Sequence, residues 1–254
     1  MQPTTIAEVV NYLHTIMQQC AGAGNRAGYF AALYKRMTMA VGEGIAKGAF
    51  EDGPRMEQLD VVFAQRYLDA WRQYGAKMPC SISWKLALDG CADKNLTVIQ
   101  HLLLGINTHI NLDLAVAAAI VAPGEKIHAL EKDFNRINDM IASLVDDVQY
   151  CLEQVWFPMR WIKRISNRQQ QDVLNFSIGV ARKTAWANAV LLAQLNNEMQ
   201  VKHIQTMDSM VLGVGKKIIQ PGTLSAMMLR AVRLTEYENI GRTIRLIDTV
   251  RIGT

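Results

Sequence analysis

Two side chains near the middle of the chain, His109 and Asp113, have the types and the spacing needed for acid–base or metal chemistry. They are four residues apart, so in a helix they face the same way. A carboxylate can orient an imidazole for proton transfer, and the same pair can bind a metal ion. The pair therefore predicts a catalytic dyad or part of a metal site. The alternative is a buried structural pair whose groups satisfy each other.

A second histidine, His101, lies eight residues before His109, and Gly105 lies midway between them. On ideal helical geometry the two histidines are about 80° apart around the helix. A glycine at this position leaves room for a ligand or for the close approach of another helix. We therefore expect His101 to border the same site.

Acidic side chains on other helices are candidates to complete the site, because helical bundles build metal centres from side chains that project inward from facing helices. Glu57 and Asp60 share one helix face, and Asp133 flanks the apolar seam of a later helix. Two acids at the start of a helix also suit the helix macrodipole, which is the structural alternative. The predicted ligands of a divalent metal are His101, His109, Asp113, Glu57, Asp60 and Asp133.

Arg182 lies among small and apolar residues of a further helix. There it would hold an anionic group of a substrate, or neutralise a buried acid. The sequence contains no His-Glu-x-x-His, no P-loop, no Gly-x-Gly-x-x-Gly and no Gly-x-Ser-x-Gly. The residues therefore indicate a candidate site and do not name a reaction.

The helix expected over residues 97–122 must position most of these groups. Thr97 is its predicted cap, and Pro123 with Gly124 stops it. Its apolar pattern contains five polar residues and no Lys or Arg between residues 101 and 113, which predicts a helix buried on most sides. Polar groups buried in this way need partners. These five residues are His101, Asn107, His109, Asn111 and Asp113.

Helical periodicity also fills the rest of the chain. We expect helices over residues 4–20, 26–48, 54–74, 78–90, 125–157 and 170–200, then a short helix after Pro221 and a final helix before the C-terminus. Gly213 and Gly215 are expected to break the helical pattern before the short helix that follows Pro221. No repeat or linker divides the chain. The predicted fold is all-α: one domain over residues 1–254, a bundle of about eight to ten helices around a buried central helix at 97–122.

Composition agrees with a globular protein of 254 residues, half of them hydrophobic and a fifth charged. The four cysteines are far apart, which predicts reduced thiols. The N-terminus shows no secretory signal, and the longest apolar run, 114–122, is shorter than the roughly 20 residues that span a bilayer. We expect a soluble, cytoplasmic protein without a membrane span.

Charge is uneven along the chain. Residues 1–154 hold 13 Lys and Arg against 17 Asp and Glu, whereas residues 155–254 hold 14 against 6. A basic C-terminal part can attract an anionic partner or an anionic surface. The basic residues are scattered, with no run of five and no interleaved aromatic residues, so we expect no nucleic-acid partner.

The motif HLLLGINTHINLDL at 101–114 resembles the signature of a bacterial family catalogued as a domain of unknown function, number 5995. Three other stretches are similar to that family: RMEQLDVVFA at 55–64, DFNRIN at 133–138 and ARKTAWANA at 181–189. Thr108 stands where a small residue is expected. Together these stretches cover most of residues 50–195. The resemblance implies an all-helical soluble protein and supplies no agreed activity.

The leading hypothesis is an enzyme with a buried His/Asp/Glu site, metal-dependent or acid–base, that acts on a small and anionic substrate. His109 would be the base or a metal ligand, Asp113 would orient it, and Arg182 would hold the substrate. The alternative is a non-catalytic module that binds a small molecule or another protein, with the same polar cluster as a structural network. The sequence does not set the oligomeric state.

Overall fold

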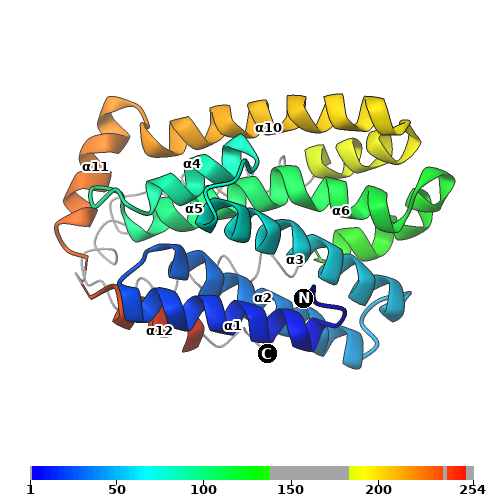
Figure 1. Ribbon diagram of the computed structural model, residues 1–254, viewed down its shortest axis with the longest axis horizontal. Coiled ribbons are helices and arrows are strands. Elements are labelled where there is room, and N and C mark those ends of the chain that lie inside the picture. Colours follow the sequence, from blue (N-terminus) through cyan, green and yellow to red (C-terminus); the bar gives the residue numbers. More distant parts are fainter. Residues whose placement is uncertain (1, 138–182, 237–238, 250–254) are drawn as a thin grey trace.

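The computed structural model describes residues 2–137, 183–236 and 239–249 (Figure 1). Within these ranges the chain forms helices and no strand, and a buried helix runs through the centre, so the predicted all-α fold is confirmed. Arg182 and the expected helical stretch 138–157 lie outside the described residues.

The first two helices form a hairpin on one side of the molecule. Helix α1, Ile6–Ala23, begins at Thr5, whose hydroxyl accepts a hydrogen bond from the Glu8 amide at 3.2 Å. It ends at Gly24, which adopts the left-handed conformation (φ 63°) that glycine takes without strain. Helix α2, Ala27–Ala46, then packs along α1 and buries a run of aromatic residues.

Helices α3, Gly53–Gly75, and α4, Ile82–Gly90, bring further aromatic side chains to the centre. Each begins with a side-chain cap. Asp52 accepts from the Arg55 amide at 3.0 Å, and Ser81 accepts from the Trp84 amide at 3.2 Å. These caps satisfy amides that have no partner within the helix itself.

The central helix is continuous but changes its hydrogen-bond pattern on the way. Helix α5, Val98–Thr108, leads into a π-helical turn, His109–Asp113, and then into α6, Leu114–Val121. Thr97 and Gln100 form a capping box at its start, as the sequence indicates. The Leu114 amide donates to the carbonyl of His109, five residues back, which defines the π turn.

By length and composition, Val98–Val121 is the one described helix that could cross a membrane. Within the protein, however, 78% of its apolar window is buried, as in the core helix of a soluble protein. The helix is therefore weak evidence for a membrane span.

The C-terminal helices differ from the predicted ones at several points. Residues 124–130 form a 3₁₀ helix, and α-helix begins only at 131. The helix expected over 170–200 is interrupted at 195–196, where Asn196 caps α10, Asn197–Ile219. Helices α11, Thr223–Arg233, and α12, Ile240–Thr249, follow.

The prediction that Gly213 and Gly215 break the helical pattern is wrong, because α10 runs through both residues to Ile219. A Cβ atom at position 215 would lie 2.8 Å from the side chain of Leu86 on α4. Gly215 thus allows two helices to approach closely, which the sequence pattern alone does not distinguish from a helix end.

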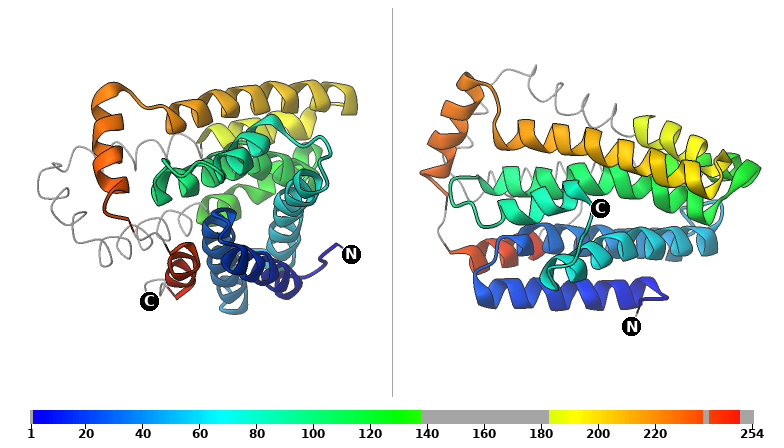
Figure 2. Two further views of the ribbon diagram at one scale, coloured as in Figure 1. Left: turned by 60° about the vertical axis from the view of Figure 1, so that its left-hand side comes forward. Right: turned by 45° about the horizontal axis from the view of Figure 1, so that its top comes forward.

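The central helix lies between two groups of helices (Figures 1 and 2). Helix α10 packs against α4 and α5 on one side, whereas α1, α2 and α12 form the other side, and α3 packs against α6. Two polar side chains of α5 join it to α10. Gln100 donates to the carbonyl of Ile218 at 2.8 Å, and Asn107 donates to the carbonyl of Val211 at 3.0 Å.

Candidate functional site

The π turn places His109 beside Asp113, as their spacing predicts, and adds two donors from other helices. Asp113 Oδ2 lies 3.0 Å from His109 Nδ1 and accepts from Trp84 Nε1 at 2.8 Å. The other carboxylate oxygen accepts from Arg66 Nε at 3.3 Å. Asp113 is 1% exposed, so these three donors compensate a charge that is otherwise costly to bury. We call His109, Asp113, Trp84 and Arg66 the core network.

Several aromatic rings from other helices pack around His109. The ring of Phe63 stacks on the imidazole at a centroid distance of 3.6 Å and an interplanar angle of 8°. Tyr34 meets it edge-on at 4.4 Å, and Phe30 and Tyr67 lie farther out. This packing fixes the ring plane and directs Nδ1 at Asp113.

Burial lowers the pKa of His109, against the opposing effect of the Asp113 carboxylate. A neutral imidazole that faces a carboxylate carries its proton on Nδ1, so Nε2 is left as an acceptor. Nε2 is buried and has no hydrogen-bond partner within the described part of the chain. The arrangement can therefore accept a proton or a hydrogen bond at Nε2, provided that a donor reaches it.

Two more buried groups lack partners in the described ranges: the hydroxyl of Tyr34, whose ring contacts His109, and one carboxylate oxygen of Asp60. Burial raises the pKa of Tyr34 well above its usual value, and the carboxylates of Asp60 and Asp113 raise it further. Burial, with a smaller effect of Glu57, raises the pKa of Asp60 from 3.8 to about 7. Asp60 thus keeps its proton to a much higher pH than an exposed carboxyl group does.

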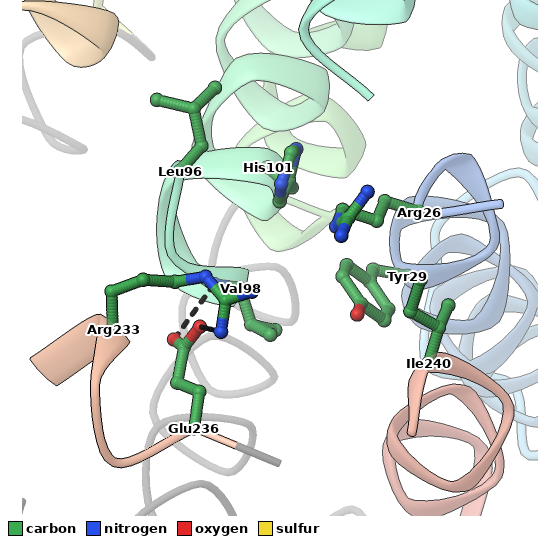
Figure 3. Close-up of a pocket in the computed structure, with 8 residues that line it drawn as sticks. All are labelled: Arg26, Tyr29, Leu96, Val98, His101, Arg233, Glu236 and Ile240. Carbon is green, nitrogen blue, oxygen red and sulfur yellow. Dashed lines mark hydrogen bonds and ion pairs between the residues drawn. The ribbon is translucent and has the colours of Figure 1, made fainter. Parts of the chain in front are cut away.

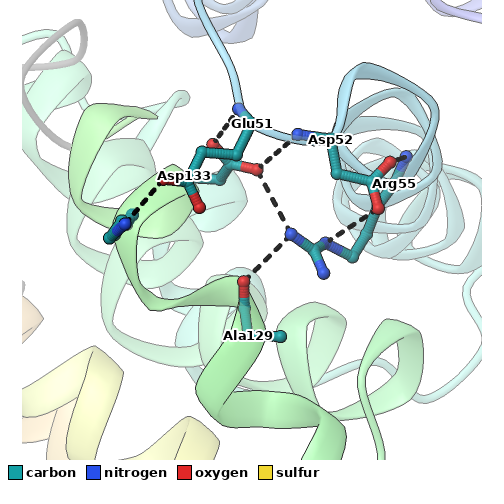
Figure 4. Close-up of polar contacts among 6 residues, drawn as sticks. Glu51, Asp52, Arg55, Ala129 and Asp133 are labelled. Carbon is teal, nitrogen blue, oxygen red and sulfur yellow. Dashed lines mark hydrogen bonds and ion pairs between the residues drawn. The ribbon is translucent and has the colours of Figure 1, made fainter.

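The structure does not gather the whole set of predicted metal ligands. Glu57 accepts from the Ile6 amide at 3.3 Å, at the start of α1. Asp133 accepts from the amides of Glu51 and Asp52 at 2.8 and 3.1 Å and pairs with Arg55, ahead of α3 (Figure 4). Residues 2–137, 183–236 and 239–249 contain no group of three or more His, Cys, Asp or Glu side chains that could hold a metal ion.

His101 borders a different site, a crevice between the start of α2, the start of α5 and the residues around the end of α11 (Figure 3). Its lining contains two arginines, one acid and two aromatic rings. The residues that carry its chemistry are Arg26, Tyr29, His101, Arg233 and Glu236, and we call this site the basic crevice.

His101 is only 5% exposed, and neither of its ring nitrogens has a hydrogen-bond partner within the described chain. Its ring packs against Tyr29 at 5.9 Å and faces the guanidinium of Arg26 (Figure 3). Burial lowers the pKa of His101 to about 4, and Arg26 contributes to this shift. The backbone of Leu96 lies near the ring and opposes the shift, but it does not meet hydrogen-bond geometry, so both ring nitrogens remain without a hydrogen bond to the described chain.

Charged groups on both sides of the crevice are anchored to backbone. Arg26 Nη1 donates to the carbonyl of Cys91 at 3.3 Å, and Arg233 Nε donates to that of Lys94 at 2.7 Å. Glu236 accepts from the Val98 amide at 2.9 Å and lies 3.7 Å from Arg233 Nη1. Burial raises the pKa of Glu236 to about 7. Even with Glu236 ionised, two arginines against one acid leave a surplus of positive charge.

A second small pocket extends from Arg26 and His101 towards the core network. Its inner wall includes Phe30, Tyr67 and Trp84, whose rings also surround His109. The two pockets have free volumes of about 10 Å³ each, which is room for one water-sized group. The aromatic wall thus separates the basic crevice from the core network.

Sequence reasoning missed Arg26, Arg233 and Glu236 as candidate residues. They come from segments more than 200 residues apart and share no motif. Arg66 was also missed, although a buried Asp is a signal that a cation is needed nearby. For Trp84, the signal is chemical, because a buried indole N–H requires an acceptor.

Comparison with known proteins gives one match. The model of a family described as "Family of unknown function (DUF5995)" matches residues 6–221. The matched range includes the core network as well as Arg26 and His101, and it ends before Arg233 and Glu236. No curated protein and no solved structure matches the chain.

Proposed function

We propose that this chain, which belongs to the family of unknown function DUF5995, binds a small organic anion in the basic crevice. The core network then has a structural role and joins α3 and α4 to the π turn of the central helix. The observation that carries the proposal is the buried ring of His101, whose nitrogens have no hydrogen-bond partner in the described chain and which lines one pocket with two arginines.

Charge and hydrogen-bonding capacity both favour an anion in this crevice. Arg26 and Arg233 each use one described hydrogen bond to a carbonyl, so each guanidinium keeps further N–H groups. The neutral ring of His101 adds one more donor. Because His101 is buried and both arginines are partly buried, their interaction with an anion is screened less than it would be on the surface.

A structural role for the core network follows from how completely Asp113 is used. Three donors from α3, α4 and the π turn converge on its carboxylate. The carboxylate of Asp113 lines neither of the two described pockets. Asp113 instead joins α3, α4 and the π turn. Helices α3 and α4 also line the second small pocket, through Tyr67 and Trp84.

Histidine side-chain NMR tests the proposal directly, since the chain has five histidines and each gives its own signal. Sodium acetate is titrated into protein with isotope-labelled histidine, against sodium chloride at equal ionic strength. We expect the His101 signal to shift and to saturate, while the exposed His128 stays still. A His101→Asn variant identifies the signal.

Paired arginine variants separate specific binding from general charge attraction. Arg26→Gln is expected to abolish saturation by acetate. Arg230→Gln removes the same charge from an exposed position on α11 and is expected to leave the affinity unchanged. Equal shifts at His101 and His128, or an equal loss in both variants, would contradict the proposal.

The second candidate function is an enzyme with acid–base or metal chemistry at His109, completed by Asp113 and Asp60. One observation favours it: Nε2 of His109 is unpartnered and buried next to Tyr34, on a π turn, a feature frequent at functional sites. Access would require the wall formed by Phe30 and Trp84 to open. Arg182, which lies outside the described residues, stays a proposed contributor to that chemistry.

The enzyme candidate makes different predictions for His109. Its signal would shift with acetate, and its pKa would lie between 6 and 8, where general bases work best. Under the binding proposal, His109 stays neutral and does not respond to acetate. Elemental analysis of the purified protein supplies a second test, since near-stoichiometric divalent metal lost in His109→Ala would favour the metal-dependent enzyme.

A further inference from the structure

Three buried carboxylates cap backbone amides that lie far away in the sequence. Asp208 on α10 caps the start of α4, Asp133 caps residues 51 and 52 ahead of α3, and Glu236 caps the start of α5. All three are at most 9% exposed. Of the three carboxylates, Glu236 has the fewest hydrogen bonds to the rest of the protein.

Asp208 and Asp133 are each held by two amides and one side chain. Asp208 accepts from Ile82 at 2.8 Å, from Ser83 at 3.0 Å and from the Ser83 hydroxyl. Asp133 has the Glu51 and Asp52 amides and Arg55 at 3.3 Å (Figure 4). Either carboxylate would lose three contacts on leaving its place.

Glu236 has one amide, from Val98 at 2.9 Å, and one arginine nitrogen at 3.7 Å, which exceeds hydrogen-bond distance. It is also the only one of the three carboxylates that lines a described pocket. Glu236 therefore occupies an anion-binding position from which a competing anion can displace it.

The surroundings of Glu236 suit an anion that arrives from solvent. The amino end of α5 carries the positive end of the helix dipole, and Val98 is its first residue. The buried ring of His101, with both nitrogens unpartnered, borders the same pocket, and Arg26 stands opposite (Figure 3). An incoming anion can thus use the Val98 amide, Arg233 and groups that Glu236 does not contact.

We propose that the anion bound in the basic crevice is a carboxylate, and that it binds by displacing the Glu236 carboxylate from the Val98 amide. This inference rests on the proposed function and names its ligand class and its internal competitor. The present occupant is itself a carboxylate, so the position already matches that group in shape and charge.

The test compares wild type, Glu236→Gln and the matched control Asp208→Asn in titrations with acetate and, separately, with inorganic phosphate. Glutamine keeps the shape of Glu236 and removes the charge that repels an entering carboxylate. We expect acetate to bind Glu236→Gln about tenfold more tightly, the factor expected if only about one molecule in ten has the position open. Asp208→Asn should leave the acetate affinity unchanged.

A second readout uses the unaltered protein, so the result does not depend on the variants folding. At saturating acetate the Val98 amide signal must move together with the His101 signal, because its hydrogen-bond acceptor is exchanged. An unchanged or weaker acetate affinity in Glu236→Gln would overturn the displacement, as would a Val98 amide that stays fixed while His101 shifts. In that case the proposed function still stands.

The remaining outcomes separate the two proposals. Saturable binding of phosphate without acetate would overturn the carboxylate assignment and leave the crevice as an anion site. No saturable binding of either probe, in wild type or in Glu236→Gln, would overturn the proposed function and this inference together.

Discussion

The core network and the basic crevice are each centred on a histidine of the same central helix, and they differ in where the partners of that histidine come from. His109 has its Nδ1 on Asp113 and its ring held by Phe63. His101 is almost as buried, but neither of its nitrogens is satisfied by the described chain. His109 uses one nitrogen within the fold and keeps Nε2 among aromatic rings, whereas both nitrogens of His101 border a pocket with surplus positive charge. The comparison therefore assigns stability to one region and binding to the other.

The largest expected effect comes from breaking the core network. Asp113→Ala leaves the indole N–H of Trp84 and the Nδ1–H of His109 without an acceptor, so we expect a loss of about 3–5 kcal/mol in the free energy of unfolding. Asp113→Asn, which keeps one acceptor oxygen, should lose about 1–3 kcal/mol. Urea unfolding followed by circular dichroism measures both values.

Asp69 supplies the control for Asp113. It pairs with Arg72 at the surface of α3, and Asp69→Asn should change the free energy of unfolding by less than about 1 kcal/mol. If Asp113→Asn proved as mild as Asp69→Asn, the core network would not hold the helices together.

A pH dependence is expected from the buried carboxyl of Asp60. Its pKa is raised from 3.8 to about 7 in the fold, so between these values the unfolded chain releases a proton that the folded chain keeps. Stability contributed by Asp60 is therefore present at low pH and falls as pH rises, by at most about 1.4 kcal/mol per pH unit. Glu236, whose pKa is also raised to about 7, adds a decline in the same range.

Urea unfolding at several pH values between 4 and 7 isolates the contribution of Asp60. The Asp60→Asn variant should show a shallower decline in the free energy of unfolding than the wild type. Parallel curves for the two proteins would mean that Asp60 is ionised in the folded state.

The wall between the two regions can be disturbed at Gly105. A methyl group added there would collide with the ring of Phe30, which contacts His109 on one side and lines the inner pocket on the other. We expect Gly105→Ala to lower the free energy of unfolding by about 1–3 kcal/mol. Gly213→Ala, in open space on α10, should instead raise it by up to about 1 kcal/mol. Thermal unfolding compares the two, and equal effects would contradict the close packing at Gly105.

Several features of both regions could be predicted from the sequence, because they depend on residues close together in the chain. The spacing of His109 and Asp113 predicted their contact, and Thr97 with Pro123 predicted the limits of the central helix. The resemblance of the 101–114 motif to a family is confirmed by the match over residues 6–221.

Other features depend on which helices meet, and local patterns do not contain that information. The aromatic side chains of Phe30, Tyr67 and Trp84 separate His109 from the crevice that His101 lines, so the two do not share one site as expected. Asp133 was expected in a metal site, and it caps the residues ahead of α3 instead. Arg233 and Glu236 reach the crevice from beyond the family match, which a motif-based argument cannot anticipate.

The smallest predicted effect concerns the protonation of His101. Burial and the nearby charge of Arg26 lower its pKa to about 4. Arg26→Gln removes the second of these causes, so the pKa of His101 should rise while burial still keeps it below 6.5. The stability loss should be about 0.5–1.5 kcal/mol, the usual value of one hydrogen bond. NMR titration of the His101 signal checks this, and an unchanged pKa would mean that Arg26 does not face His101.

Anion binding is assigned to the basic crevice and stability to the core network, and one paired measurement distinguishes these two roles. Acetate affinity and the free energy of unfolding are determined together for wild type, Arg26→Gln and Asp113→Asn. We expect Arg26→Gln to lose acetate binding with little loss of stability. We expect folded Asp113→Asn to lose stability and to keep the wild-type affinity for acetate. Acetate binding lost in folded Asp113→Asn and kept in Arg26→Gln would contradict this assignment, and would place the ligand at His109.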